Sequence, residues 1–155
     1  MKKRNLGAAI AALAAAMTLV LCACGGGGAA EPFDPASTAS ALLDSGAFSE
    51  NLEQLDQDVA CMLYGIDEST VTGSAVYGST GATAEEIAVF TLTDETAAQA
   101  AKTALETRVA DQKTALESYL PAEIVKLDAA IIEQRGSSVL MVVAADAEAA
   151  QAVLK

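Results

Sequence analysis

Histidine is absent from the 155-residue sequence, and its absence excludes several classes of enzyme at once. Without an imidazole there is no Ser-His-Asp or Cys-His catalysis, and no metal site can use histidine ligands. The sequence also lacks a GxSxG nucleophile motif, a phosphate-binding Gly-Lys-Ser/Thr loop and a GxGxxG stretch. We therefore expect no enzymatic activity, no cofactor and no metal site.

Basic residues are scarce, with nine lysines and arginines against 21 aspartates and glutamates and a formal net charge of −12. Nucleic-acid binding is disfavoured, because it needs a basic patch that displaces counterions from phosphates. The negative charge keeps a protein soluble and repels it from anionic lipid. Attachment to a membrane must therefore come from a feature other than surface charge.

The N-terminus provides such a feature. Lys2, Lys3 and Arg4 form a short basic region, and an uncharged apolar run extends from residue 6 to residue 21. This run is shorter than the ~20 residues that a membrane-spanning helix needs, and it is typical of the hydrophobic part of a signal peptide. The alternatives are an uncleaved membrane anchor or cleavage at a nearby Ala-x-Ala sequence.

A cysteine follows the apolar run in a characteristic setting. Ala23 is a small residue directly before Cys24, and Leu21 is an aliphatic residue three positions before it. This resembles the lipobox of bacterial lipoproteins, in which the cysteine is acylated and becomes the new N-terminus. Cys22 fits less well because bulky Leu21 precedes it. We predict a lipoprotein signal peptide over residues 1–23, a lipid anchor on Cys24, and a location at the extracytoplasmic face of the cell membrane.

The rest of the chain is long enough for one domain. Loss of residues 1–23 would remove three basic and no acidic residues, leaving six against 21 and a net charge of −15. Only Cys61 would remain as a free thiol, so no internal disulfide is possible and the fold depends on its apolar core. The glycine-rich stretch over residues 24–34 predicts a flexible tether. The domain is expected over residues 35–155.

Hydrophobic periodicity and turn residues predict eight elements. They are helices over about 36–43 and 50–64, strands over 71–77 and 86–92, a helix from residue 93 or 94 to 120, strands over 127–134 and 138–144, and a helix from 146 to 155. Residues 123–132 could instead be helical, and we prefer a strand from residue 129 on. This order predicts an α+β fold of two layers, with helices on one face of an antiparallel sheet of about four strands.

Particular residues define some of these elements. Asp34 and Asp146 are expected to begin helices as N-terminal caps, and Gly65 to end one. Thr93 or Asp94 is expected to start the long helix, with Asp94 and Glu95 well placed at its positive end. The helix over 50–64 rests on apolar residues at helical spacing, namely Leu52, Leu55, Val59, Met62 and Ile66. The stretch 139–143 is apolar on both faces, which places it in the middle of the sheet.

Several short segments resemble a known family. In chain order they are Leu63–Asp67, Tyr77–Ser79, Gly81–Ala82, Glu85–Phe90, Tyr119–Pro121 and Gly136 before an apolar strand. The sequence is similar here, over roughly residues 36–150, to small Gram-positive lipoproteins built on a domain of unknown function of the 4358 type. The resemblance implies a compact domain that is attached to the membrane through a lipid anchor. It implies no activity, substrate or catalytic residue.

Carboxylate pairs are the remaining groups that could perform acid–base chemistry or bind a cation. Neighbours on a strand point to opposite faces, and residues two apart on a helix do not share a face. The three pairs are Asp56 with Asp58, Asp67 with Glu68, and Glu85 with Glu86. We predict that they form an acidic surface, that Cys61 packs as a small hydrophobe, and that the charged residues of the long helix, Arg108 among them, are solvated.

The loop over residues 77–82 is the candidate for recognition. Tyr77, Ser79 and Thr80 bring an aromatic ring and two hydroxyls to a turn between strands, where functional residues often lie. The alternative, which we favour, is a hairpin connection whose glycines supply positive φ angles. Tyr64 and Tyr119 are expected to pack at helix ends with their hydroxyls reaching water.

These features favour a non-catalytic binding or accessory domain at the cell surface, with an envelope protein as its possible partner. A carboxylate-based cell-envelope hydrolase is the first alternative, and it requires two acidic side chains that converge in a cleft. A small-solute binding lipoprotein is the second, although the domain is small for two lobes that close on a ligand.

Overall fold

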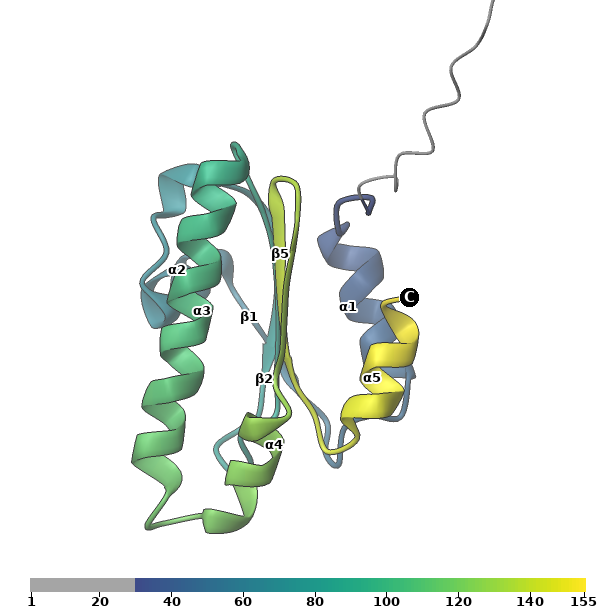
Figure 1. Ribbon diagram of the computed structural model, residues 1–155, viewed down its shortest axis with the longest axis vertical. Coiled ribbons are helices and arrows are strands. Elements are labelled where there is room, and N and C mark those ends of the chain that lie inside the picture. The colour runs from purple at the N-terminus through teal and green to yellow at the C-terminus, as the bar shows by residue number, and fades with distance from the viewer. Residues whose placement is uncertain (1–29) are drawn as a thin grey trace, which may run out of the picture.

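An antiparallel sheet of five strands forms the centre of the computed structural model, which describes residues 30–155 (Figure 1). In spatial order the strands are β1 (Glu53–Leu55), β2 (Val71–Gly78), β3 (Glu86–Leu92), β5 (Ser138–Val143) and β4 (Ile131–Arg135). All neighbouring strands run antiparallel. The α+β class is confirmed, with five strands in place of about four.

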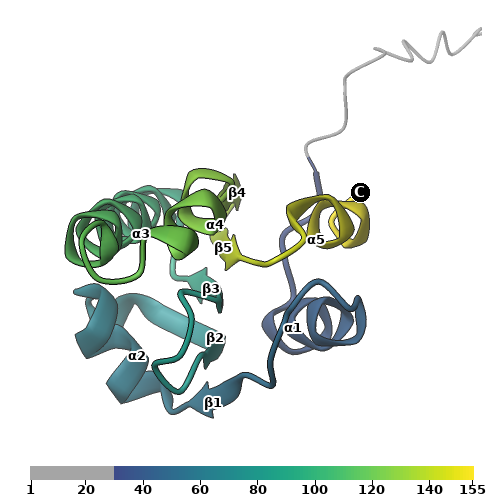
Figure 2. The same ribbon diagram turned by 90° about the horizontal axis from the view of Figure 1, so that it is seen from below.

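Helices cover both faces of the sheet, so the domain has three layers instead of the predicted two (Figure 2). Helices α1 (Pro35–Asp44) and α5 (Ala147–Val153) lie on one face. Helices α2 (Gln57–Tyr64), α3 (Glu95–Leu116) and α4 (Ile124–Asp128) lie on the other. The prediction of helices on one face was wrong because the central strands are apolar on both sides, and each apolar face needs a cover.

Each face of the sheet has its own core. On the face of α2 and α3, Phe90 and Met141 pack against Leu105, and all three side chains are fully buried. On the face of α1 and α5, Ile87 and Leu140 pack in a second cluster with Leu42. Every residue of β5 is buried, which confirms its predicted position inside the sheet.

The predicted capping residues begin and end the helices. Asp34 accepts from the Ser37 amide at 2.9 Å, Asp94 from the Ala97 amide at 2.8 Å, and Asp146 from the Ala149 amide at 2.9 Å. Each bond satisfies a backbone N–H that has no partner within its helix. Gly65 ends α2 with φ of 67°, a left-handed conformation that glycine adopts without steric cost.

The predicted helix over 50–64 is wrong in its first half and in its buried face. Strand β1 occupies residues 53–55, and α2 begins only at Gln57. Within α2, Val59 and Met62 are 41% and 79% exposed, whereas Ala60, Cys61 and Tyr64 are buried. The prediction was wrong because it counted Leu52 and Leu55 as part of the helical spacing, whereas both residues precede α2.

Residues 123–132 were predicted as either a helix or a strand, and each prediction is correct for part of the stretch. Two short helices, η2 (Pro121–Glu123) and α4, occupy the first half of this stretch. A separate short helix, η1 (Glu68–Thr70), lies elsewhere in the chain, directly before β2. Strand β4 begins at Ile131, two residues after the predicted start. Leu127 of α4 is buried against α3, so this irregular stretch is part of the core.

Packing begins before the predicted domain boundary at residue 35. Phe33 is 5% exposed, and its amide donates to Ser138 Oγ at 2.8 Å. The Arg135 guanidinium covers its ring at 4.2 Å. The predicted signal peptide, Cys24 and most of the predicted tether lie outside the described residues. Within residues 30–155, no helix is both long enough and apolar enough to cross a membrane.

Candidate functional site

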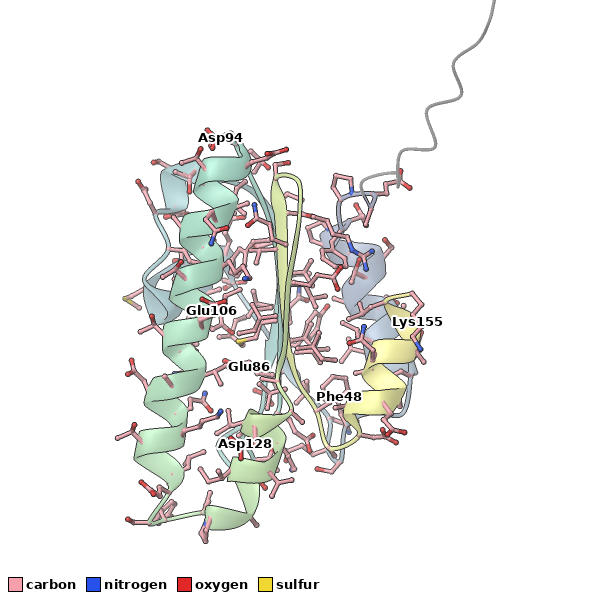
Figure 3. All side chains as sticks on the ribbon, in the orientation of Figure 1. Phe48, Glu86, Asp94, Glu106, Asp128 and Lys155 are labelled. Carbon is pink, nitrogen blue, oxygen red and sulfur yellow. The ribbon has the colours of Figure 1, made fainter. Side chains whose placement is uncertain are left out.

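A cleft of about 340 Å³ lies beside the loop that joins β2 to β3, where α2 and α3 also contribute residues. Its walls combine apolar side chains with a charged pair and loop hydroxyls; they include Leu55, Leu63, Ser79, Thr83, Glu86, Arg108, Gln112 and Leu116. Figure 3 shows Glu86 between the sheet and α3. The cleft therefore places a charged group beneath an apolar rim.

Glu86 is the charged residue at the start of β3, and it is 5% exposed. Its Oε1 accepts from Tyr64 Oη at 2.8 Å and from Arg108 Nη2 at 3.3 Å. The Gln112 amide, with its oxygen toward Arg108, accepts from Arg108 Nε at 3.0 Å. The carboxylate, phenol, guanidinium and amide thus satisfy one another without a ligand.

Tyr64 is buried and does not reach water as predicted, because its hydroxyl is directed at Glu86. Burial, followed by the Glu86 carboxylate, raises the pKa of the Tyr64 hydroxyl far above its ordinary value. The hydroxyl therefore remains protonated and serves as a donor. Tyr119, by contrast, is 79% exposed, so its hydroxyl reaches water but its ring does not pack at the helix end as predicted.

Replacing Tyr64 by phenylalanine should lower the free energy of unfolding by about 1.5–3 kcal/mol, the usual contribution of a hydrogen bond to a charged group. The ring and its edge-to-face contact with Phe90 remain, so the loss measures the hydroxyl. Urea unfolding followed by circular dichroism is the measurement. An unchanged midpoint would show that Arg108 alone satisfies Glu86.

A second acidic network lies at the same end of β3. Glu85 is 1% exposed, and its carboxylate accepts from Lys126 Nζ at 2.8 Å and from the Ser49 amide at 2.9 Å. Lys126 also lies 3.0 Å from Glu123 Oε2, and Glu123 accepts from the Ala84 amide at 2.9 Å. Lys126 therefore joins α4 and η2 to the start of β3.

The charge of Glu85 is fixed by opposing effects. Burial by itself would raise the pKa of its carboxyl, but hydrogen bonds from Lys126 and Ser49 outweigh burial and hold the pKa below its ordinary value. Glu85 is thus an anion at neutral pH and a weak base. Its partners differ entirely from those of Glu86, as expected for neighbours on a strand.

The other predicted acidic pairs lie at helix ends. Asp67 accepts from the Ser69 amide at 3.0 Å and caps η1, while Asp56 precedes α2.

Cys61 is 3% exposed, and burial, followed by the charges of Glu68, Asp58 and Asp67, raises the pKa of its thiol. Among residues 30–155 no three potential ligands are grouped closely enough to hold a metal ion.

The predicted binding residues do not converge on one point. Tyr77 packs against the core on the face of α1 and α5. Ser79 lines the cleft, but its hydroxyl donates to Glu50 and accepts from the Gly81 amide at 3.2 Å. Thr80 is exposed in the same loop, and Gly81 has the positive φ, 104°, that a hairpin connection requires. A binding role for these three residues stays a prediction.

Arg108 and Lys126 are the residues that sequence reasoning missed. Arg108 was expected on a solvated surface, yet only 27% of its side chain is exposed, and Lys126 is 18% exposed. The sequence did contain a signal for buried basic residues, namely two carboxylates next to a strand that is apolar on both faces. Buried carboxylates need cationic or hydrogen-bonding partners. The sequence did not reveal which of the few basic residues would supply them.

A family model described as "Domain of unknown function (DUF4358)" matches residues 44–144. This range includes the whole sheet, helices α2 to α4, the cleft and both acidic networks. Comparison with curated proteins and with solved structures finds no match. The predicted resemblance to a domain of unknown function of the 4358 type is thereby confirmed.

Proposed function

The chain belongs to the family with the domain of unknown function DUF4358, and we propose the following role on the basis of the chain's own residues. The protein is anchored through a lipid on Cys24 at the extracytoplasmic face of the cell membrane, and its domain is a non-catalytic binding or accessory module. The lipobox sequence at Leu21–Cys24 supports the anchor. The exposed face of α2 supports the binding role.

That face carries the observation on which the proposal rests. Val59, Met62 and Leu63 follow helical spacing, so their side chains form one stripe, and they are 41%, 79% and 42% exposed. Leu63 also lines the cleft, which joins the stripe to the apolar rim. A contiguous apolar patch on a domain of this charge is typical of an interaction site.

The arrangement of the acidic residues favours binding over hydrolysis. A carboxylate-based hydrolase needs two acidic side chains that converge on a substrate, one of them with a raised pKa. Here Glu85 and Glu86 both line the cleft, but each is neutralised by a different cation, and the pKa of Glu85 is lowered. Within residues 30–155 no buried side-chain polar atom lacks a hydrogen-bond partner, so the networks are complete as they stand.

Small-solute binding is the second candidate, and the cleft is its basis. Its volume of about 340 Å³ lies at the lower end of the ~300–1,000 Å³ typical of ligand pockets. Its charged floor is already paired internally, however, and a solute would have to compete with those bonds. A rise in melting temperature with a defined solute would support this candidate, because a ligand of the native state stabilises it.

Cross-linking in intact source cells tests the proposed function. The tagged protein is captured after cross-linking and analysed by mass spectrometry beside a Cys24→Ala variant that cannot be anchored. We expect an envelope protein that is enriched only with the anchored form. Equal recovery from the two forms, or no enriched protein, would contradict an accessory role at the membrane.

A further inference from the structure

We propose that the apolar stripe of α2 and the adjoining cleft bind a basic amphipathic segment of a partner protein. We call this surface the α2 surface and define it by Val59, Met62 and Leu63 together with Leu55 and Leu116 at the rim of the cleft. The inference rests on the proposed binding function and adds the chemistry of the partner.

Helix α2 is apolar on two sides, and only one of them is covered. Ala60, Cys61 and Tyr64 face the core, while Val59, Met62 and Leu63 face outward. A helix that is hydrophobic on opposite faces is normally buried on both. The spacing of the outward side chains, i, i+3 and i+4, is the spacing by which one helix packs its anchors into a groove. The outer face therefore suits a helical occupant.

Negative charge lies at both ends of this stripe. Asp56 and Asp58 lie at the start of α2, and Asp67 and Glu68 follow its end. None of these four carboxylates takes part in a salt bridge of the described domain. Their field reaches into the helix, because Glu68, Asp58 and Asp67 add to burial in raising the pKa of the Cys61 thiol. The stripe is thus an apolar centre with an acidic border.

The domain has almost no cation left to balance this border. Residues 30–155 contain six basic side chains. Five of them are paired with carboxylates; they are Lys102, Arg108, Lys113, Lys126 and Arg135. The remaining one is Lys155 at the C-terminus. Complementary charge must therefore come from the partner, as lysines or arginines beside its apolar anchors.

The same charges disfavour two other occupants. A second copy of the chain would bring an identical acidic border against the first, and like charges in register repel. An anionic membrane surface would be repelled for the same reason. A segment with leucines on one face and lysines on the other satisfies both the stripe and its border.

Peptide binding tests this inference. The chain from residue 24, carrying Cys24→Ala so that no lipid is attached, is titrated into two fluorescein-labelled peptides of about 18 residues, or five helical turns. Both peptides have the same leucine face, and their other positions are lysine in one and glutamate in the other. We expect saturable binding of the lysine peptide alone, followed by anisotropy, with an affinity that falls as salt rises.

Met62→Asp separates specific docking from general attraction. We expect it to weaken binding of the lysine peptide about tenfold or more, although it adds a negative charge that would strengthen non-specific attraction. Val125→Asp makes the same kind of change at an apolar residue of α4 that is 72% exposed, and it should leave the affinity unchanged. Met62→Ala, which introduces no charge, should weaken binding in the same direction by less.

Four outcomes would overturn the inference. They are equal or tighter binding by Met62→Asp, equal loss in Val125→Asp, no saturable binding of the lysine peptide, and a dimer in sedimentation that Met62→Asp dissociates. The last outcome would assign the surface to a second copy. Failure of the peptide test with a partner still captured by the anchored protein in cells would leave the proposed function standing and reject only the partner chemistry.

Discussion

Replacing Lys126 by methionine should lower the free energy of unfolding by about 3–5 kcal/mol at pH 7, the usual cost of removing one partner from a buried ion pair. Lys126 neutralises two carboxylates that water hardly reaches, Glu85 and Glu123, whose side chains are 0% and 11% exposed. Methionine keeps most of the volume of the lysine stem and removes only the charge. The loss therefore reports the two unpaired anions.

In this variant the contribution of Glu85 to stability should change with pH in the opposite sense to its contribution in the parent protein. In the parent, the pKa of Glu85 is lowered by folding, so its contribution is present above the unfolded pKa and is lost as the pH falls through the folded pKa. Without Lys126, only the hydrogen bonds from Ser49 oppose burial, and we expect the folded pKa of Glu85 to rise above the unfolded one. The folded variant then binds more protons than the unfolded chain, and its deficit in stability should shrink as the pH is lowered from 7 to about 4.

Urea unfolding of both proteins at pH 7 and pH 4 measures these effects. Lys113→Met is the matched control, because its ion pair with Asp128 is exposed, at 37% and 65%, and such pairs contribute only about 0–1 kcal/mol. A loss in Lys126→Met no larger than in the control would contradict the network described around Glu85. A deficit that does not change with pH would place the effect in packing and not in charge.

Replacing Phe90 by alanine should also lower the free energy of unfolding by about 3–5 kcal/mol, the range for truncating a buried phenylalanine. Phe90 is fully buried on β3 and packs edge to face against Tyr64, with ring centroids 5.9 Å apart. A cavity at this position removes the support beneath Tyr64, whose hydroxyl holds Glu86 at the cleft. We therefore expect both lower stability and a less well-ordered cleft.

Denaturant unfolding of Phe90→Ala beside Tyr119→Ala provides the comparison. Tyr119 is an aromatic residue of the same domain that is 79% exposed, and its truncation should change stability by no more than about 0.5 kcal/mol. Binding of the lysine peptide to Phe90→Ala should weaken if the cleft loses its order. Similar losses from the two truncations would mean that Phe90 does not hold together the core between the sheet and α2 with α3.

The sequence by itself determined the features that depend on a few consecutive residues. The caps at Asp34 and Asp146 and the end of α2 at Gly65 were predicted correctly, because a capping bond spans only three or four residues. Of the two predicted starts of α3, Thr93 and Asp94, the structure has Asp94 as the cap. The β2–β3 and β4–β5 hairpins followed from apolar runs separated by turn residues. The absence of histidine removed whole classes of catalysis without any structure.

The tertiary structure decided what depends on residues far apart in the chain. Lys126 meets Glu85 across 41 positions and Arg108 meets Glu86 across 22, separations at which no periodicity specifies a partner. The sequence likewise could not say which side of α2 would be covered, because both sides are apolar and the choice depends on where the sheet lies. Burial of Ala60, Cys61 and Tyr64 against the core left Met62 outside, and this arrangement created the surface to which we assign a partner.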